Sequence, residues 1–161
     1  MSLRSLSLGL GLASLSGVLA WVAPPSAWAS SALTLQVTYK VTEKSAKCPA
    51  ATHPQGGCVW LTGKALNSHS PWTEMRRLAS VGASAAALPA GCDSATTSGV
   101  LQGKHGTIHF KGAGYYCPKT DTALYHYTFD AAQAKRFELP VNGTIRYVGS
   151  SNTETFASSA Q

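Results

Sequence analysis

The histidines of this chain are the first residues to test for chemistry, because an imidazole can bind a metal ion or transfer a proton near neutral pH. His105 and His109 are four residues apart, which would join them on a helix but separates them by about 13 Å on a strand. His109 and His126 lie on neighbouring predicted strands and could share a sheet face. Flanked by Lys111 and Tyr115, this pair would suit acid–base cleavage of a phosphodiester, so it is our candidate for catalysis. The pattern favours a simpler interpretation, two surface histidines on the wet face of a sheet.

Other catalytic patterns are weaker. Glu74, Asp121 and Glu138 are among only seven acidic residues, and their spacing does not predict a glycosidase pair. Residues 82–86, Gly-Ala-Ser-Ala-Ala, resemble a nucleophile elbow, but that elbow requires an α/β sheet that this sequence does not predict. The sequence has no glycine-rich phosphate loop and no C-x-x-C pair. We therefore predict no metal and no cofactor, and we favour a binding protein over an enzyme.

Aromatic side chains indicate binding more strongly. They concentrate in and beside the predicted strands, and the candidates for a ligand-binding face are Trp60, Trp72, Tyr115, Tyr125 and Tyr127. If several of them line one concave face, they would form a site for a small apolar ligand or a protein partner. The alternative is that about half of them belong to the core and the rest are scattered over the surface.

The N-terminal residues have the pattern of a secretory signal peptide. Arg4 gives a positive start, residues 6–22 are apolar but diluted with glycine and serine, and Ala27-Trp28-Ala29 is a cleavage motif. We predict a signal peptide over residues 1–29 and a single domain over residues 30–161, exported to the extracellular space or the periplasm. The diluted apolar run predicts no stable membrane anchor.

The distribution of charge in the sequence argues against a nucleic-acid partner. The net charge is +6, but the basic residues are scattered, so we predict no nucleic-acid-binding arm. Asn142-Gly143-Thr144 is a glycosylation sequon if the host is eukaryotic.

The four cysteines predict two disulfides, because their number is even and the chain is expected in an oxidising compartment. Three pairings are open. We favour Cys48–Cys58, which closes a short loop rich in proline and glycine, and Cys92–Cys117, which joins an alanine-rich segment to the end of a long strand.

Alternating polarity predicts the strands. Residues 33–41 place Leu, Leu, Val, Tyr and Val on one face and polar side chains on the other, the period of a half-buried strand. Segments 43–57 and 82–91 are predicted loops, and further strands are predicted at 58–66, 72–81, 98–103, 107–117, 123–129, 133–139, 144–148 and 153–156. Gly112 and Gly114 inside a long strand mark either a bulge or the bend of a barrel wall. We predict an all-β fold, a small antiparallel β-barrel, with a β-sandwich as the alternative.

Residues 142–149, Asn-Gly-Thr-Ile-Arg-Tyr-Val-Gly, resemble a strand of the allene oxide cyclase barrel-like proteins. Those proteins carry a Gly-Thr-Gly-Arg-Tyr-x-Gly pattern near the end of a small calycin-like barrel, in which residues 103–114 would be an earlier strand. Here Ile145 replaces the middle glycine and Ser150 the usual alanine. The resemblance implies a calycin-like fold. It transfers no catalytic residue, so we do not predict cyclase activity.

Together these patterns favour a secreted, non-enzymatic β-barrel module that binds a small apolar ligand in the barrel mouth or an extracellular protein through its aromatic face. One alternative is a small secreted, nuclease-like hydrolase that uses His109 and His126, which requires their imidazoles within about 7 Å of each other. The other is a calycin-like protease inhibitor that inserts residues 30–32 or the loop between Cys48 and Cys58 into an enzyme.

Overall fold

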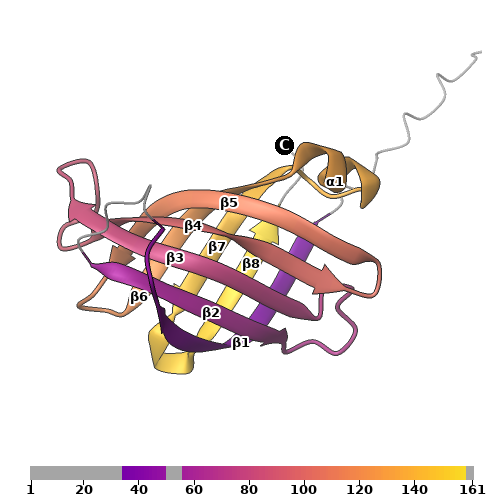
Figure 1. The fold of residues 1–161 in the computed structure, drawn as a ribbon, viewed down its shortest axis with the longest axis horizontal. Coiled ribbons are helices and arrows are strands. Elements are labelled where there is room, and N and C mark those ends of the chain that lie inside the picture. The colour runs from indigo at the N-terminus through magenta and orange to yellow at the C-terminus, as the bar shows by residue number, and fades with distance from the viewer. Residues whose placement is uncertain (1–33, 50–55, 159–161) are drawn as a thin grey trace, which may run out of the picture.

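A computed structural model describes residues 34–49 and 56–158. These ranges form one closed, all-antiparallel barrel of eight strands, in which each strand pairs with the next and β8 pairs back with β1 (Figure 1). The all-β barrel prediction is therefore confirmed. The elements are β1 (Leu35–Ala46), β2 (Gly57–Ala65), β3 (Glu74–Ser84), β4 (Asp93–Gly103), β5 (Gly106–Cys117), β6 (Thr122–Phe129), α1 (Ala131–Arg136), β7 (Asn142–Val148), the short 3-10 turn η1 (Gly149–Ser151) and β8 (Thr153–Ser158). The predicted signal peptide, residues 1–29, lies outside the described residues.

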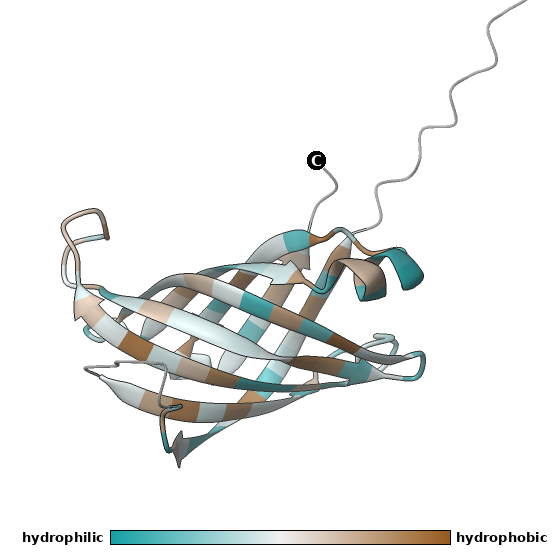
Figure 2. Ribbon diagram, turned by 45° about the horizontal axis from the view of Figure 1, so that its top comes forward, coloured by the Kyte–Doolittle hydropathy of each residue, from teal (hydrophilic) through white to brown (hydrophobic). Residues whose placement is uncertain are grey.

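Alternating side chains build the barrel, because successive residues of a strand point to opposite faces. On β1, Leu35, Val37, Tyr39 and Val41 are buried, while most of the residues between and after them are exposed. Figure 2 shows the same mixture of hydrophobic and hydrophilic positions along the other strands. The inward positions of all eight strands meet in one core.

The up-and-down topology gives the barrel two distinct ends. Odd-numbered strands begin at the end that carries α1, which we call the α1 end, and even-numbered strands finish there. The opposite end, which we call the disulfide end, holds both predicted disulfides, Cys48–Cys58 and Cys92–Cys117. Both predicted pairings are thus confirmed.

The interior changes in character along the barrel axis. Toward the α1 end, aromatic rings pack edge to face, with Phe110 and Phe156 centroids 5.1 Å apart and Tyr127 and Phe129 centroids 4.7 Å apart. Nearer the disulfide end, the interior contains an ion pair between Arg77 and Glu154. The barrel core is therefore filled by side chains, as expected for eight strands.

Several boundaries differ from the prediction, and β4, predicted at 98–103, begins already at Asp93. The strand predicted at 133–139 is wrong, because Asp130 accepts a hydrogen bond from the Gln133 N–H at 2.9 Å and caps the short helix α1. The loop predicted at 43–57 begins later, because residues 43–46 pair with β2. The loop predicted at 82–91 is shorter, because β3 continues to Ser84.

The glycines of β5 mark a bend and not a bulge. The pairing of β5 with β4 and with β6 is regular, and the shift in register lies elsewhere, between Val81 and Ser84 on β3. A Cβ atom built on Gly114 would collide with the backbone carbonyl oxygen of Leu124 on β6. Glycine is needed here because the two backbones approach closely where the wall curves.

Candidate functional site

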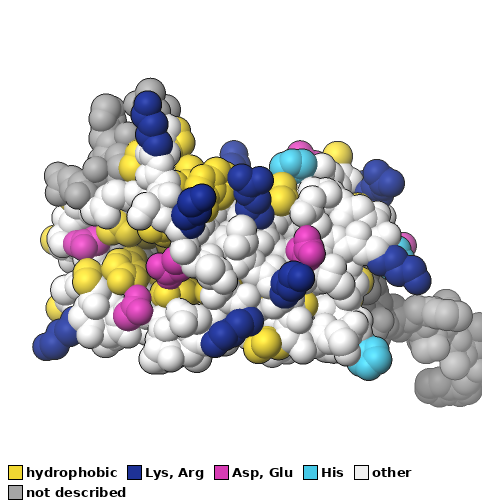
Figure 3. All heavy atoms as spheres, turned by 60° about the horizontal axis from the view of Figure 1, so that its bottom comes forward, with side chains coloured by type: hydrophobic (Ala, Val, Ile, Leu, Met, Phe, Trp, Pro, Cys, Tyr) yellow, Lys and Arg dark blue, Asp and Glu magenta, His cyan; other side chains and the backbone are white. Residues whose placement is uncertain are grey.

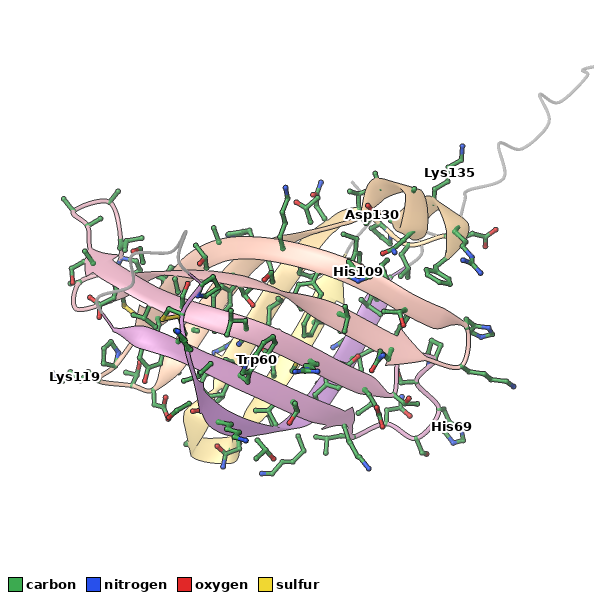
Figure 4. The ribbon with its side chains drawn as sticks, in the orientation of Figure 1. Trp60, His69, His109, Lys119, Asp130 and Lys135 are labelled. Carbon is green, nitrogen blue, oxygen red and sulfur yellow. A yellow bond between two sulfur atoms is a disulfide. The ribbon has the colours of Figure 1, made fainter. Side chains whose placement is uncertain are left out.

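The two histidines of the candidate catalytic pair both lie on the outer face of the barrel, but far apart. The β5–β6 register pairs His126 with Ala113, which is four residues from His109. Four strand residues span about 13 Å, too far for one proton transfer across a substrate. His109 instead lies against α1, where its backbone N–H donates to the Gln133 side-chain oxygen at 2.7 Å (Figure 4). The pair that the nuclease-like hydrolase requires is not assembled.

The predicted ligand-binding aromatics do not gather on one face. Trp60 lies on the outside of β2 beneath the Arg76 guanidinium, whose central carbon is 4.6 Å from the ring centroid. Tyr115 is half-buried on the outside of β5, and Tyr125 and Tyr127 are buried inside the barrel. Trp60 borders a shallow depression on the outside of the barrel, together with Arg76 and His109, whereas Trp72 lines a hollow at the α1 end.

That hollow, which we call the α1-end hollow, has a volume of about 550 Å³. Its size falls within the usual range of small-molecule sites. Four segments build it: the start of β1, the β2–β3 loop, the β4–β5 turn and the residues that follow α1. The lining residues are Thr34, Leu35, Gln36, Val37, Asn67, His69, Ser70, Pro71, Trp72, His105, Arg136, Phe137, Glu138 and Leu139.

Trp72 is an apolar lining residue of the hollow and is only 3% exposed. Its ring packs edge to face on Phe137, with centroids 5.1 Å apart. Its backbone carbonyl accepts a hydrogen bond from the Tyr39 hydroxyl at 3.1 Å, and its N–H donates to Ser70 Oγ at 3.1 Å. The indole is therefore held in place from the barrel interior and from its own loop.

Helix α1 sets the opposite wall of the hollow. Ala134 is fully buried, and its carbonyl accepts from the Leu139 N–H at 2.9 Å, which folds residues 136–139 back over the barrel end. Glu138 adopts a left-handed φ of 54° in this turn. The fold-back presents Phe137 and Leu139, both half-buried, to the hollow, while Arg136 stays exposed at its rim.

A buried ion pair occupies the barrel interior. Arg77 Nη2 lies 2.5 Å from Glu154 Oε1, and the two side chains are 1% and 0% exposed. Arg77 also donates to Thr97 Oγ1 at 3.1 Å and stacks on Tyr125, with its guanidinium carbon 4.8 Å from the ring centroid. Burial raises the pKa of Glu154, while Arg77 acts against that rise.

Sequence reasoning missed this pair. In the strand predicted at 72–81, Arg77 interrupts the run of apolar side chains. Its position was nevertheless informative, because Arg77 shares the inward period of Met75 and Ala79, just as Glu154 shares that of Phe156. A charge at an inward position of a strand signals an internal partner.

Two tyrosine–carboxylate pairs lie at the disulfide end. The Tyr147 hydroxyl donates to Glu43 Oε1 at 2.5 Å, and the Tyr116 hydroxyl donates to Asp121 Oδ1 at 3.0 Å. Burial, with smaller contributions from the nearby carboxylates, raises the pKa of Tyr116 to about 12. Burial and the hydrogen bond to Glu43 likewise raise the pKa of Tyr147.

The carboxylates considered for a glycosidase are also separated. Asp121 lies in the turn before β6 at the disulfide end, whereas Glu74 begins β3 and Glu138 follows α1 at the other end. Within residues 34–49 and 56–158, no group of three histidine, cysteine or acidic side chains is placed to hold a metal ion. In the same ranges, no helix is long and apolar enough to cross a membrane.

Comparison with known proteins adds no relative. No protein-family model matches the chain, and neither a curated protein nor a solved structure matches it.

Proposed function

We propose that this chain is a secreted, non-enzymatic β-barrel module that binds a small apolar molecule in the α1-end hollow. The observation that carries the proposal is a hollow of about 550 Å³ whose walls include Trp72, Phe137 and Leu139. Ligand sites commonly combine such apolar walls with a few polar groups that fix orientation. The two disulfides support export, because structural disulfides persist in oxidising compartments.

The rim provides the polar groups. His69, His105 and Arg136 are exposed around the hollow, and the Arg136 guanidinium carbon lies 5.4 Å from the Phe137 ring centroid. An apolar molecule seated on Trp72 would therefore keep any polar end near these side chains. These rim side chains are placed to orient a bound molecule and not to catalyse a reaction on it.

The other hypotheses have less support. The protease-inhibitor hypothesis depends on residues 30–32 and on the loop between Cys48 and Cys58, of which residues 30–32 and 50–55 lie outside the described residues. The aromatic face expected to meet a protein partner is divided between the outside and the inside of the barrel. The similarity to allene oxide cyclase barrel-like proteins stays a prediction that concerns the fold alone.

A fluorescence titration with N-phenyl-1-naphthylamine, a neutral apolar probe, tests the proposal. We expect saturable binding to the mature domain at one site. Phe137→Ala should weaken it about tenfold, because losing the buried part of one phenyl group costs roughly 1.5 kcal/mol. The matched control is Leu66→Ala, since Leu66 is 60% exposed and does not line the hollow. Equal affinities of the two variants, or enhancement that never saturates, would contradict the proposal.

A further inference from the structure

The disulfide end of the barrel has a chemistry opposite to that of the α1 end. Its inward and rim positions carry Glu43, Tyr116, Asp121 and Tyr147, with Glu154 beneath them; we call this set the acidic mouth. Figure 3 shows acidic side chains gathered around hydrophobic ones, a class that there includes tyrosine, at one end of the molecule. Such a concentration is unexpected in a chain with a net charge of +6 and only seven acidic residues.

Among the described residues, the rim carboxylates form no ion pair with a lysine or arginine. Within residues 34–49 and 56–158, the ion pair is Arg77–Glu154, and Glu43 and Asp121 accept from tyrosine hydroxyls instead. Exposed Lys47 and Lys119 belong to the same end, but neither forms an ion pair with these carboxylates. No lysine or arginine of the described residues therefore contacts the rim carboxylates directly.

The floor of the mouth contains an unpartnered acceptor. Glu154 is fully buried, and its Oε1 is paired with Arg77 Nη2 at 2.5 Å, whereas Oε2 has no partner in the described ranges. Its backbone position pairs with Tyr147 across β7 and β8, so both side chains point into the same part of the interior. Buried acceptors are rarely left unpaired in native proteins, and this one lies below the rim carboxylates.

Several inward positions of this half are small. Ala79, Ala95 and Ala123 supply single methyl groups, and Gly114 supplies none. They lie among the larger buried side chains of Arg77, Tyr125 and Tyr147, which give this half a polar interior. The α1 half is filled by phenylalanine and tyrosine rings.

We propose that the acidic mouth binds an alkylammonium group, carried either by a free amine or by a lysine side chain of a peptide. Glu43 and Asp121 would accept its N–H donors at the rim, with the unpartnered Glu154 Oε2 as the deepest acceptor. The tyrosine faces would pack on its methylene groups and attract its charge. An organic cation suits this geometry better than a metal ion, because the acidic groups of the described residues do not converge as metal ligands do. This site is independent of the α1-end hollow.

Titration of the mature domain with butylammonium, followed by NMR chemical shifts, tests the proposal. We expect saturable shifts for Tyr116 and Tyr147, and weaker or absent shifts with butanol and butyrate, which match the chain length without the positive charge. Glu43→Gln and Asp121→Asn should each weaken binding about three- to tenfold, as expected for the loss of one partly exposed charge contact. The double variant should weaken it further.

The matched control is Glu138→Gln, which removes an exposed carboxylate at the α1 end. Unchanged binding by this variant assigns the effect to the acidic mouth and not to net charge. Nα-acetyl-lysine amide, compared with butylammonium, separates the peptide source from the free amine. The proposal is overturned if butanol binds as well as butylammonium, if Glu43→Gln and Asp121→Asn bind normally, or if the shifts map to the α1 end. Calcium binding without ammonium binding would also overturn it.

Discussion

Replacing Arg77 with methionine should destabilise the barrel more than any comparable surface substitution. Arg77 and Glu154 are 1% and 0% exposed, so removing the guanidinium leaves a carboxylate buried without its counter-ion. Breaking a buried ion pair in this way costs about 3–5 kcal/mol, a large part of the roughly 5–15 kcal/mol that stabilises a typical domain. Methionine approximates the stem of arginine and limits the cavity contribution.

The double variant Arg77→Met/Glu154→Leu should recover much of the loss. An apolar pair of similar volume needs no charge compensation, and such replacements are often neutral or stabilising. Urea unfolding followed by tryptophan fluorescence gives the free energies for the full double-mutant cycle. Arg76→Met is the matched control, because the neighbouring Arg76 is exposed and stacks on Trp60, an interaction worth about 0.5–1 kcal/mol.

The cost of Arg77→Met should also depend on pH. Burial raises the pKa of Glu154, and removing Arg77 raises it further because Arg77 opposes that rise. The folded variant then binds a proton more tightly than the unfolded chain, whose glutamate pKa is about 4.3. Its stability should fall as pH rises from about 4.3 toward the folded-state pKa, so the penalty is larger at pH 8 than at pH 5. A penalty that does not change with pH, or a double variant less stable than both single variants, would refute this reasoning.

Three further predictions concern the wall and the interior. Removing the Cys92–Cys117 disulfide should lower the free energy of unfolding by about 3.5 kcal/mol, and removing Cys48–Cys58 should lower it by about 3 kcal/mol, because the two disulfides close loops of 25 and 10 residues. Variants in which both cysteines of one disulfide are replaced by serine, unfolded in urea, measure each cost. A larger cost for the shorter loop would contradict this reasoning. Burial raises the pKa of Tyr116 and Tyr127 to about 12, so both should stay protonated in the folded domain at pH 11 and ionise on unfolding. Because the folded state then holds protons that the unfolded state loses, the free energy of unfolding should fall as pH rises from about 10 toward 12. Tyrosinate absorbance that is equal in the folded and unfolded domain at pH 11 would count against this. Gly114→Ala should cost more than about 2 kcal/mol, because its Cβ meets backbone, and Ala113→Gly on the outer face is the control, at about 0.5–1 kcal/mol.

The sequence contained enough information to predict the barrel. The strict alternation of apolar and polar side chains in residues 35–41 predicts a strand with one buried and one solvent-exposed face. The glycines inside β5 indicated a curved barrel wall. Even the disulfide pairing followed from the loop lengths and the strand ends. Helix α1 escaped the prediction because its six residues are too few for a helical period, and its cap at Asp130 could be read equally well as a turn.

The candidate sites could not be predicted in the same way. The period of two places Tyr125 and Tyr127 on one face of β6, but it does not say whether this face is the filled interior or a binding surface. The separation of His109 and His126 depended on strand register, which a one-residue step along β6 would alter.

The amino-acid sequence by itself determined which side chains of each strand are hidden, because that depends on a period of two that is local to the chain. Only the tertiary structure decided what those side chains meet. Closing β8 against β1 brought Glu154 within an ionic contact of Arg77, and the fold-back after α1 brought Phe137 onto Trp72. These contacts join residues more than sixty positions apart, and no local pattern encodes them because they depend on the register of every strand around the barrel.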